Sequence, residues 1–423
     1  MITRRSIIIA MSLTLCLSLT AACDAPGSGA SVTGAPAVSN HSVADMSSTA
    51  EPACEFGAVS AGSQETEPPG LGANEQVEVL LLMNHGAIDD KWYNQAAHEA
   101  VARYAAEHGM PYDYFTPAEA SSHVYSDFIG TAIAGGGSAK VIAAPGVFIE
   151  QPVFDAQDLF PDVSFIMIDG VPQPGDFSTY RVGDNTVSVT FAVQEAGFLA
   201  GYAVVLDGYR NLGFIGGIAT PPYPDHGENI SYGYGFVCGA EAAAQDLGLP
   251  QGEVTIKYIN TGKLAPDPKT QAIAAAWFHS GTEVIFAGAA AIGLSVIPAA
   301  EQAGGKMIGI DLDQSLFSQS IVTSAVKNIG KATCDMIDAF RAGAFPGGRS
   351  VEYSAAEDGV GLSMDTSRFT VFSQGDYDRV YARVASGEFD IPAYDSVGAV
   401  SEIPLNAVTI LCPEDGFTVI DAP

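Results

Sequence analysis

The chain has few basic residues: 18 Lys and Arg stand against 49 Asp and Glu among 423 residues, and the formal net charge is -31 at pH 7. Nucleic-acid binding needs clustered cations to meet the phosphates, and the sequence contains no such cluster. A strongly acidic surface favours solubility and is repelled by anionic lipid. The composition therefore argues against a nucleic-acid partner and leaves the ligand open.

Catalytic and metal-binding motifs are lacking as well. There is no Gly-x-Ser-x-Gly elbow, no P-loop, no His-Glu-x-x-His and no Gly-x-Gly-x-x-Gly that opens a helix. No Cys-x-x-Cys pair or Cys/His cluster has the spacing of a metal site. We therefore expect a protein that is not an enzyme and that binds neither a metal nor another cofactor.

The amino-terminal residues have the pattern of an export signal. Two arginines precede an apolar run over residues 7–19, and small residues and Cys23 follow it. The run is too short to span a membrane, and no later apolar run reaches about 18 residues free of charge. A cysteine at this point resembles a bacterial lipobox, although Thr20 replaces the usual Leu. We predict a lipoprotein signal peptide over residues 1–22 and lipidation of Cys23; an ordinary signal peptide with an incidental cysteine is the alternative.

Residues 23–75 are rich in Ser, Ala, Gly and Pro and contain very few large apolar side chains. Such a segment cannot bury enough surface to offset the entropy that ordering would cost. We predict a flexible linker between a lipid anchor and a folded domain. The protein is then expected on the extracytoplasmic face of the bacterial cell membrane.

Four cysteines remain beyond the predicted lipidation site. They allow three pairings, and export permits disulfides. We expect a bridge between Cys54 and Cys412, because both flank the core domain. Cys238 and Cys334 lie in helical patterns, where a small apolar role is commoner.

From residue 76 onward, short apolar segments alternate with helical patterns. Strand–helix alternation of this kind predicts an α/β fold with parallel sheets covered on both faces, and the number of strands favours two doubly wound lobes with a ligand cleft at the hinge. The expected strands are 77–83, 112–115, 140–144, 164–169, 211–215, 254–258, 283–286, 306–310 and 320–325. The expected helices include 94–108, 190–206, 232–247, 268–279, 293–303 and 329–342.

The loop over residues 88–95 reads Ile-Asp-Asp-Lys-Trp-Tyr-Asn-Gln and follows the first expected strand. In open α/β sheets, ligands bind at the carboxyl ends of strands. The loop resembles the Asn-Asp-Lys-Ser-Phe-Asn-Gln signature of the basic membrane lipoprotein family, whose members are periplasmic-binding-protein-like lipoproteins that capture nucleosides for ABC importers. Further matches occur in the family's order at residues 195–201, 213–217, 232–236, 309–315, 323–327, 357–362 and 386–388.

The resemblance implies a fold of the type I periplasmic-binding-protein kind. On this basis we expect residues 76–189 and 311–336 to form lobe I, and residues 190–310 and 337–392 to form lobe II. Residues 393–423 fall outside the family pattern, and the sequence suggests no function for this C-terminal extension.

A nucleoside site needs aromatic faces for the base, carboxylates for the ribose hydroxyls and amides for the base edge. Tyr93 takes the position of the family's Phe and is expected to stack on a base, or else to pack on its own helix. Asn94 is expected to contact the base edge or to cap the helix that begins there. Asn84 stands where the family has a ligand-contacting Asp, so a group that both donates and accepts replaces one that only accepts.

Two acidic residues end expected strands. Asp169 is placed to accept hydrogen bonds from a ligand, or to serve as a turn residue. The resemblance implies that Asp311 grips the ribose hydroxyls and that Lys327 lies in the cleft, where it orients Asp311 or donates to a hydroxyl. A solvated Lys327 is the alternative.

Tyr232 and Phe286 are the aromatic candidates in the second lobe. Together with Tyr93 they would clamp a base from both sides, although an aromatic residue that ends a buried strand is often only part of the core.

These expectations combine into one function: a monomeric solute-binding lipoprotein that captures a purine nucleoside for an ABC permease in the membrane. Two alternatives use the same cleft. One is a ligand-sensing module for a membrane receptor, and the other is a binder of a different small polar solute such as a sugar.

Overall fold

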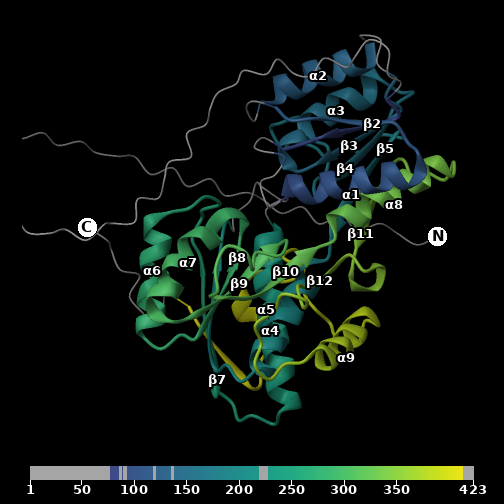
Figure 1. The fold of residues 1–423 in the computed structure, drawn as a ribbon. Coiled ribbons are helices and arrows are strands. Elements are labelled where there is room, and N and C mark those ends of the chain that lie inside the picture. The colour runs from purple at the N-terminus through teal and green to yellow at the C-terminus, as the bar shows by residue number, and fades with distance from the viewer. Residues whose placement is uncertain are drawn as a thin grey trace, which may run out of the picture. The chain divides into compact units, whose positions relative to one another are not determined.

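The structure is a computed structural model that describes residues 77–84, 88, 93–117, 121–134, 138–218 and 227–412. Parallel strands alternate with helices and form two sheets, each covered by helices (Figure 1). The predicted fold class, two doubly wound parallel-sheet lobes, is confirmed. The predicted signal peptide, Cys23, the linker over residues 23–75 and residues 89–92 of the loop 88–95 lie outside the described residues.

The first sheet has the strand order β11-β5-β4-β3-β1-β2, and its strands are parallel. Strand β1 shows how its helices are arranged: Leu80 and Leu82 pack with α2 and α3, whereas Leu81 packs with α1 and α8. Burial on both faces explains why this strand is apolar throughout. The elements are β1 (Val79–Leu82), α1 (Tyr93–His108), β2 (Tyr112–Phe115), α2 (Ser122–Ala134), β3 (Val141–Pro145), α3 (Glu150–Leu159), β4 (Ser164–Ile168), β5 (Thr186–Phe191), α8 (Ile329–Arg341) and β11 (Arg349–Tyr353).

The second sheet has the order β12-β10-β9-β8-β6-β7-β13, in which only β12 is antiparallel to its neighbour. Phe286 of β8 packs toward α4 and α5, and its neighbour Ile285 packs toward α6 and α7. The elements are α4 (Val193–Leu206), β6 (Asn211–Gly216), α5 (Gly227–Asp246), β7 (Val254–Asn260), α6 (Pro268–His279), β8 (Val284–Gly288), α7 (Gly293–Ala303), β9 (Lys306–Asp311), β10 (Ile321–Lys327), β12 (Val360–Leu362), α9 (Gln374–Ala385) and β13 (Val408–Leu411).

All nine predicted strands and all six predicted helices are present. Two helix starts differ from the prediction. The predicted helix from residue 190 begins at Val193, because Thr190 and Phe191 complete strand β5, and the predicted helix from residue 232 begins earlier, at Gly227. The expected strands and helices do not include α2, α3, α9, β5, β11, β12 or β13, of which β12 has only three residues.

The points where the chain crosses between lobes also differ from the prediction. The sequence assigns residues 311–336 to lobe I, yet β10 pairs with β9 in the second sheet, and only α8 returns to pack beside α1. It assigns residues 337–392 to lobe II, yet β11 pairs with β5 in the first sheet. Strand partners are decided by tertiary packing, so local patterns do not reveal to which lobe a returning strand belongs.

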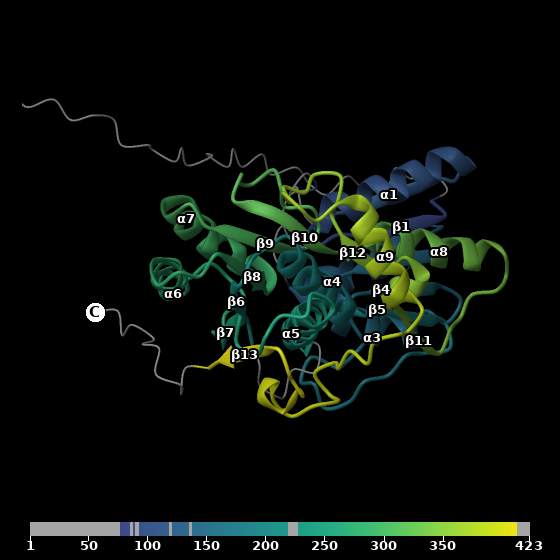
Figure 2. The same ribbon diagram turned by 90° about the horizontal axis from the view of Figure 1, so that it is seen from below.

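The C-terminal extension adds a strand to the second sheet. Strand β13 pairs in parallel with β7 and forms that edge of the sheet (Figure 2). The buried carboxylate of Glu241 on α5 accepts hydrogen bonds from the backbone N–H groups of Asn406 and Val408, each at 2.8 Å, and from that of Ala407. The extension is therefore anchored to the second lobe as far as residue 412.

Helices α4 and α5 touch through glycines on both partners. A Cβ atom at Gly201 of α4 would overlap the carbonyl oxygen of Phe236, and one at Gly235 of α5 would overlap the carbonyl oxygen of Gln194. Likewise, a Cβ atom at Gly197 of α4 would overlap the carbonyl oxygen of Tyr232, and one at Gly239 of α5 would overlap that of Phe198. Because only glycine lacks the Cβ atom, these positions let the two backbones pack directly against each other.

We predict that Gly201→Ala lowers the free energy of unfolding by about 1–3 kcal/mol or more, since the new methyl group overpacks the α4–α5 contact. Gly130→Ala in α2 is the matched control: its Cβ would meet nothing within 4 Å. Alanine is the better helix former there, so this variant should be about 0.5–1 kcal/mol more stable. Denaturant unfolding measures both, and a Gly201→Ala variant as stable as the parent chain would contradict the contact.

Candidate ligand-binding site

The two sheets carry an aspartate at equivalent places. Strands β4 and β9 occupy the same position in the orders β2-β1-β3-β4-β5 and β7-β6-β8-β9-β10. Asp169 directly follows β4 and Asp311 ends β9, and both have left-handed backbones, with φ of 63° and 66°. Asp tolerates this conformation better than most residues, so the same local turn ends both strands.

Lys327, the last residue of β10, joins these two carboxylates. Its Nζ atom donates to the Asp169 carboxylate at 3.0 Å and 2.8 Å, and lies 3.4 Å from Oδ1 of Asp311. The side chains of Lys327, Asp169 and Asp311 are 3%, 11% and 15% exposed. The alternative of a solvated Lys327 is therefore wrong: it is a buried amine paired with carboxylates from both sheets, as buried charges require.

Tyr232 adds a hydroxyl to this cluster. It lies in α5, and its hydroxyl donates to Oδ1 of Asp311 at 3.3 Å. Its buried ring meets the edge of Phe286, with centroids 5.8 Å apart.

Phe286 does not line a cleft. Its side chain is fully buried on β8, and its ring packs against those of Phe214 and Phe236 at centroid distances of 5.5 Å and 5.3 Å. This placement contradicts the prediction that Phe286 closes over a base. The sequence could not separate the two roles, because a buried strand end and a cleft wall share the same apolar pattern.

Asn84 and Asn94 meet at the same edge of the first sheet as Asp169. The side-chain amide of Asn94 donates to the backbone carbonyl of Asn84 at 3.0 Å, which ties the start of α1 to the end of β1. The Asn84 side chain lies directly against Gly146, whose N–H donates to the carbonyl of Ile168 at 2.8 Å. The ends of β1, β3 and β4 therefore form one continuous edge from Asn84 to Asp169.

Tyr93 begins α1, where it is half-buried against the hydrophobic core. Its loop neighbours 89–92 lie outside the described residues. Of the predicted site residues, Lys327 contacts Asp169 and Asp311, Tyr232 contacts Asp311, and Asn84 and Asn94 contact each other.

Burial raises the pKa of Asp311 above its ordinary value of 3.8; Lys327 lowers it again, and the nearby Asp169 adds to the rise. Two carboxylates share one amino group in this cluster. Carboxylates accept hydrogen bonds and an ammonium group donates them, so the cluster can hold a ligand that presents neighbouring hydroxyl groups.

A cavity of about 330 Å³ lies on another side of Asp169. Sequence reasoning missed its walls, because they come from the end of β5, from β11 and from the C-terminal extension. The period-two alternation over residues 186–191 was the one available signal. The lining residues are Asp169, Gly170, Val171, Tyr180, Thr190, Phe191, Val193, Gln194, Ser231, Glu352, Ala393, Tyr394 and Asp395.

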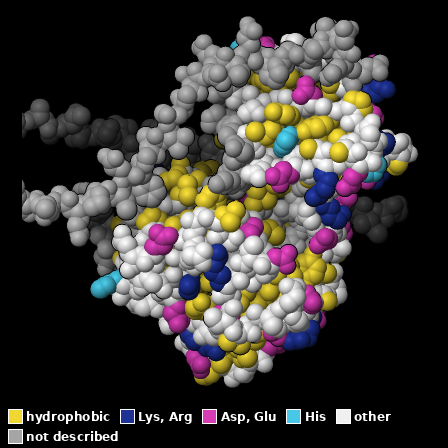
Figure 3. Space-filling model, in the orientation of Figure 1, with side chains coloured by type: hydrophobic (Ala, Val, Ile, Leu, Met, Phe, Trp, Pro, Cys, Tyr) yellow, Lys and Arg dark blue, Asp and Glu magenta, His cyan; other side chains and the backbone are white. Residues whose placement is uncertain are grey.

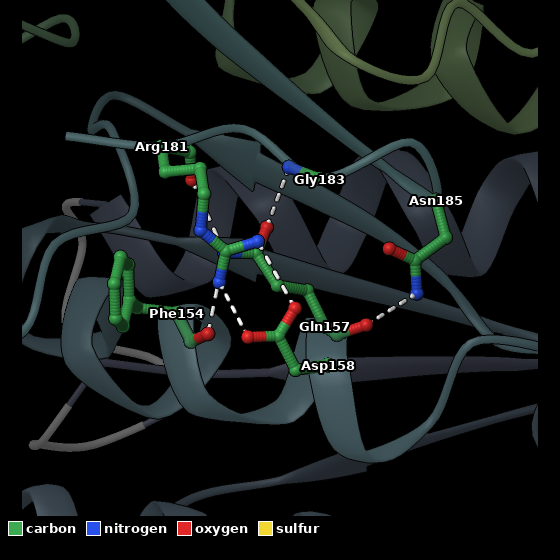
Figure 4. A network of polar contacts seen from close by, with 6 residues as sticks. All are labelled: Phe154, Gln157, Asp158, Arg181, Gly183 and Asn185. Atoms are coloured by element: carbon green, nitrogen blue, oxygen red, sulfur yellow. Dashed lines mark hydrogen bonds and ion pairs between the residues drawn. The ribbon is translucent and has the colours of Figure 1, made fainter.

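The segment between Asp169 and β5, which carries Tyr180 into the cavity wall, is held by α3 (Figure 4). The buried amide of Gln157 donates to the carbonyl of Arg181 at 3.1 Å and accepts from the N–H of Gly183 at 2.7 Å. Arg181 also forms two hydrogen bonds to Asp158, at 3.0 Å and 2.6 Å. These contacts fix a long connection that has no regular secondary structure.

Three further observations concern metal sites, membrane spans and surface charge in the described part of the chain. Within the described ranges, no group of three or more His, Cys, Asp and Glu side chains is arranged to hold a metal ion. No helix in those ranges is long and apolar enough to cross a membrane. On the face drawn in Figure 3, Lys and Arg side chains lie among Asp and Glu side chains.

The cysteines follow the prediction in part. Cys238 in α5 and Cys334 in α8 are free and partly buried against the core, and burial raises the pKa of their thiols to about 12 and about 11. The predicted bridge between Cys54 and Cys412 involves a residue outside the described ranges.

The family described as ABC transporter substrate-binding protein PnrA-like matches residues 77–386. The chain belongs to this family. The ABC transporter nucleoside-binding protein BmpA of Lactococcus lactis is 26% identical over 335 residues, which cover 73% of this chain and 88% of that protein. Basic membrane protein A of Borreliella burgdorferi is 26% identical over 325 residues, which cover 75% and 88%.

Solved structures agree on the fold. An ABC transporter solute-binding protein from Conexibacter woesei superposes with a TM-score of 0.58 at 21% identity, covering 75% of this chain and 99% of that one. One from Aeropyrum pernix gives a TM-score of 0.57 at 21% identity, covering 76% and 96%. The family is one of solute-binding proteins rather than enzymes, and membership implies a small-molecule ligand and an ABC permease as partner.

We predict that Asp311→Asn gains stability relative to the parent chain as pH rises. The folded state holds the Asp311 proton more tightly than the unfolded state, so the stability contributed by Asp311 is complete below about pH 3.9 and is lost as pH rises through its raised pKa. An asparagine side chain has nearly the same shape but does not titrate, so its contribution to the free energy of unfolding does not fall as pH rises. Denaturant unfolding of ligand-free protein between about pH 4 and 7 measures the difference, and a constant difference over that range would contradict the prediction.

Proposed function

We propose that this protein is an extracytoplasmic, lipid-anchored solute-binding protein that captures a purine nucleoside and delivers it to an ABC permease. One observation carries the proposal: a carboxylate from each sheet, Asp169 and Asp311, meets the buried amine of Lys327 at the strand ends. Strand ends are where open α/β sheets bind ligands.

The chemistry of this cluster suits a ribose. Two neighbouring hydroxyl groups can donate to Asp311 and Asp169 while Lys327 and Tyr232 donate to sugar oxygens. An uncharged ligand adds no further charge to a buried ion cluster, which favours a nucleoside over a nucleotide. Tyr93 and Asn84, at the other end of the same sheet edge, are the candidates to contact the base.

Similarity supports the same assignment. The Lactococcus lactis relative is named as a nucleoside-binding protein, at 26% identity. The Cys23 lipobox pattern and the linker over residues 23–75 support a lipid anchor on the outer face of the membrane. We assign transport rather than sensing because the family works with ABC permeases.

The direct test is calorimetric titration of the chain from residue 24 onward, stripped of bound ligand by unfolding and refolding. Adenosine, guanosine, inosine, cytidine and uridine are the ligands, with ribose and arabinose as sugar controls. Submicromolar one-to-one binding of a purine nucleoside is the expected result. If a free sugar binds and no nucleoside gives heat, the proposed ligand is wrong and the protein is a sugar-binding protein.

Two variants test the roles of single residues. Asp311→Ala should abolish nucleoside binding while the fold remains intact by circular dichroism, and Tyr93→Ala should weaken binding by about 1–3 kcal/mol if the ring stacks on the base. Asp365→Asn removes an exposed carboxylate elsewhere and should bind like the parent chain. Unchanged affinity in Asp311→Ala would remove that residue from the site.

Asn84→Asp tests base recognition. The amide of Asn84 can donate or accept, whereas a carboxylate only accepts. We predict that Asn84→Asp shifts the preference toward inosine and guanosine, whose N1 atoms carry a proton, and away from adenosine, whose N1 atom accepts. The ratio of dissociation constants for inosine and adenosine measures this shift, and an unchanged ratio would show that Asn84 does not face the base.

A further inference from the structure

The cavity beside Asp169 has a wall that the family pattern does not supply. The family match ends at residue 386, whereas Ala393, Tyr394 and Asp395 of the C-terminal extension line the cavity. Its volume of about 330 Å³ falls within the range of small-molecule sites. The extension therefore gives this chain a compartment that the matched region alone does not enclose.

We propose that this cavity binds a small organic cation, an amine or quaternary ammonium group. Its described lining includes three carboxylates, from Asp169, Glu352 and Asp395, and no Lys, Arg or His. It also includes the aromatic side chains of Tyr180 and Phe191, besides Tyr394 from the extension. Aromatic faces and carboxylates together attract a cation and repel an anion.

Two of the lining carboxylates, Glu352 and Asp395, lie close enough to affect each other. Burial raises the pKa of the Glu352 carboxyl, and the negative charges of Asp395 and Glu357 add to that rise. A bound cation would relieve this repulsion, whereas a phosphate would increase it. The Asp169 carboxylate already accepts hydrogen bonds from Lys327 and is paired with its positive charge. Glu352 and Asp395 are therefore the lining carboxylates that a bound cation would pair with.

The Phe191 ring already contacts one cation of the protein itself. The amine of Lys327 lies 5.9 Å from the centroid of the Phe191 ring, within the range of a cation–π contact. Among the aromatic residues that line the cavity, Phe191 is almost completely buried, whereas Tyr394 is more than a third exposed.

The wall formed by the extension is held in place. The backbone N–H of Tyr394 donates to Oγ of Ser231 on α5 at 3.0 Å, and the Glu241 carboxylate on the same helix holds the N–H groups around Ala407. Ser231 and Glu241 of α5 therefore hold the extension at two points, near Tyr394 and near Ala407. Tyr394 and Asp395 are thus positioned by α5, the helix that also carries Tyr232.

The test uses two probes of equal shape, choline and its neutral carbon analogue 3,3-dimethyl-1-butanol. Ligand-observed NMR titration of the nucleoside-free chain from residue 24 onward should give saturable choline binding at least about fivefold tighter than that of the analogue. A fivefold effect corresponds to one unscreened charge contact at about 4 Å in water. No nucleoside is present, so the result does not depend on the proposed transport function.

Glu352→Gln and Asp395→Asn should each weaken choline binding by about fivefold, and Tyr394→Ala by about two- to fivefold. Asp365→Asn is the matched control, because it removes one exposed carboxylate outside the cavity, and it should leave the affinity unchanged. The proposal is overturned by equal binding of the two probes, by no saturable choline binding, or by unchanged affinity in both carboxylate variants while circular dichroism shows an intact fold.

Discussion

The direct backbone contact between α4 and α5 is the constraint on which the site depends. Glycines on both helices remove the Cβ atoms that would hold the backbones apart, so α5 lies in one fixed position against α4. From that position α5 carries Tyr232 to Asp311, Ser231 to the C-terminal extension and Glu241 to the segment before β13. The packing of α5 on α4 thus positions both Tyr232 in the charged cluster and the part of the C-terminal extension that lines the cavity.

Each lobe contributes its charged residue through the same construction. Strands β4 and β9 are each third in the orders β11-β5-β4 and β12-β10-β9, and an aspartate with a left-handed backbone stands at the carboxyl end of each. Lys327 lies between the two carboxylates. Lys327 ends a strand of the second sheet, so its contact with Asp169 links the two lobes through a buried ion pair. A buried charge that loses its partner is costly. The ion pair between Lys327 and Asp169 therefore favours lobe positions in which the two residues stay in contact.

The matched family region and the extension have separate parts in this molecule. Residues 77–386 supply both sheets up to β12, the charged cluster and the strand-end edge that reaches Asn84. The extension adds β13 to the second sheet and lines a cavity that shares Asp169 with the cluster. Asp169 therefore belongs both to the charged cluster and to the lining of the cavity that the extension helps to form.

The sequence by itself determined the fold class, most of the strands and helices that the structure describes, and the acidic residues at strand ends, because burial periodicity and strand-end position are local properties. Tertiary structure alone decided that Lys327 joins Asp169 to Asp311, that Phe286 belongs to the core, and that Tyr394 lines a cavity. Each of these depends on residues far apart in the chain meeting across two sheets. No local pattern encodes such a meeting, since which strands pair and which helices touch is set by the packing of the whole domain.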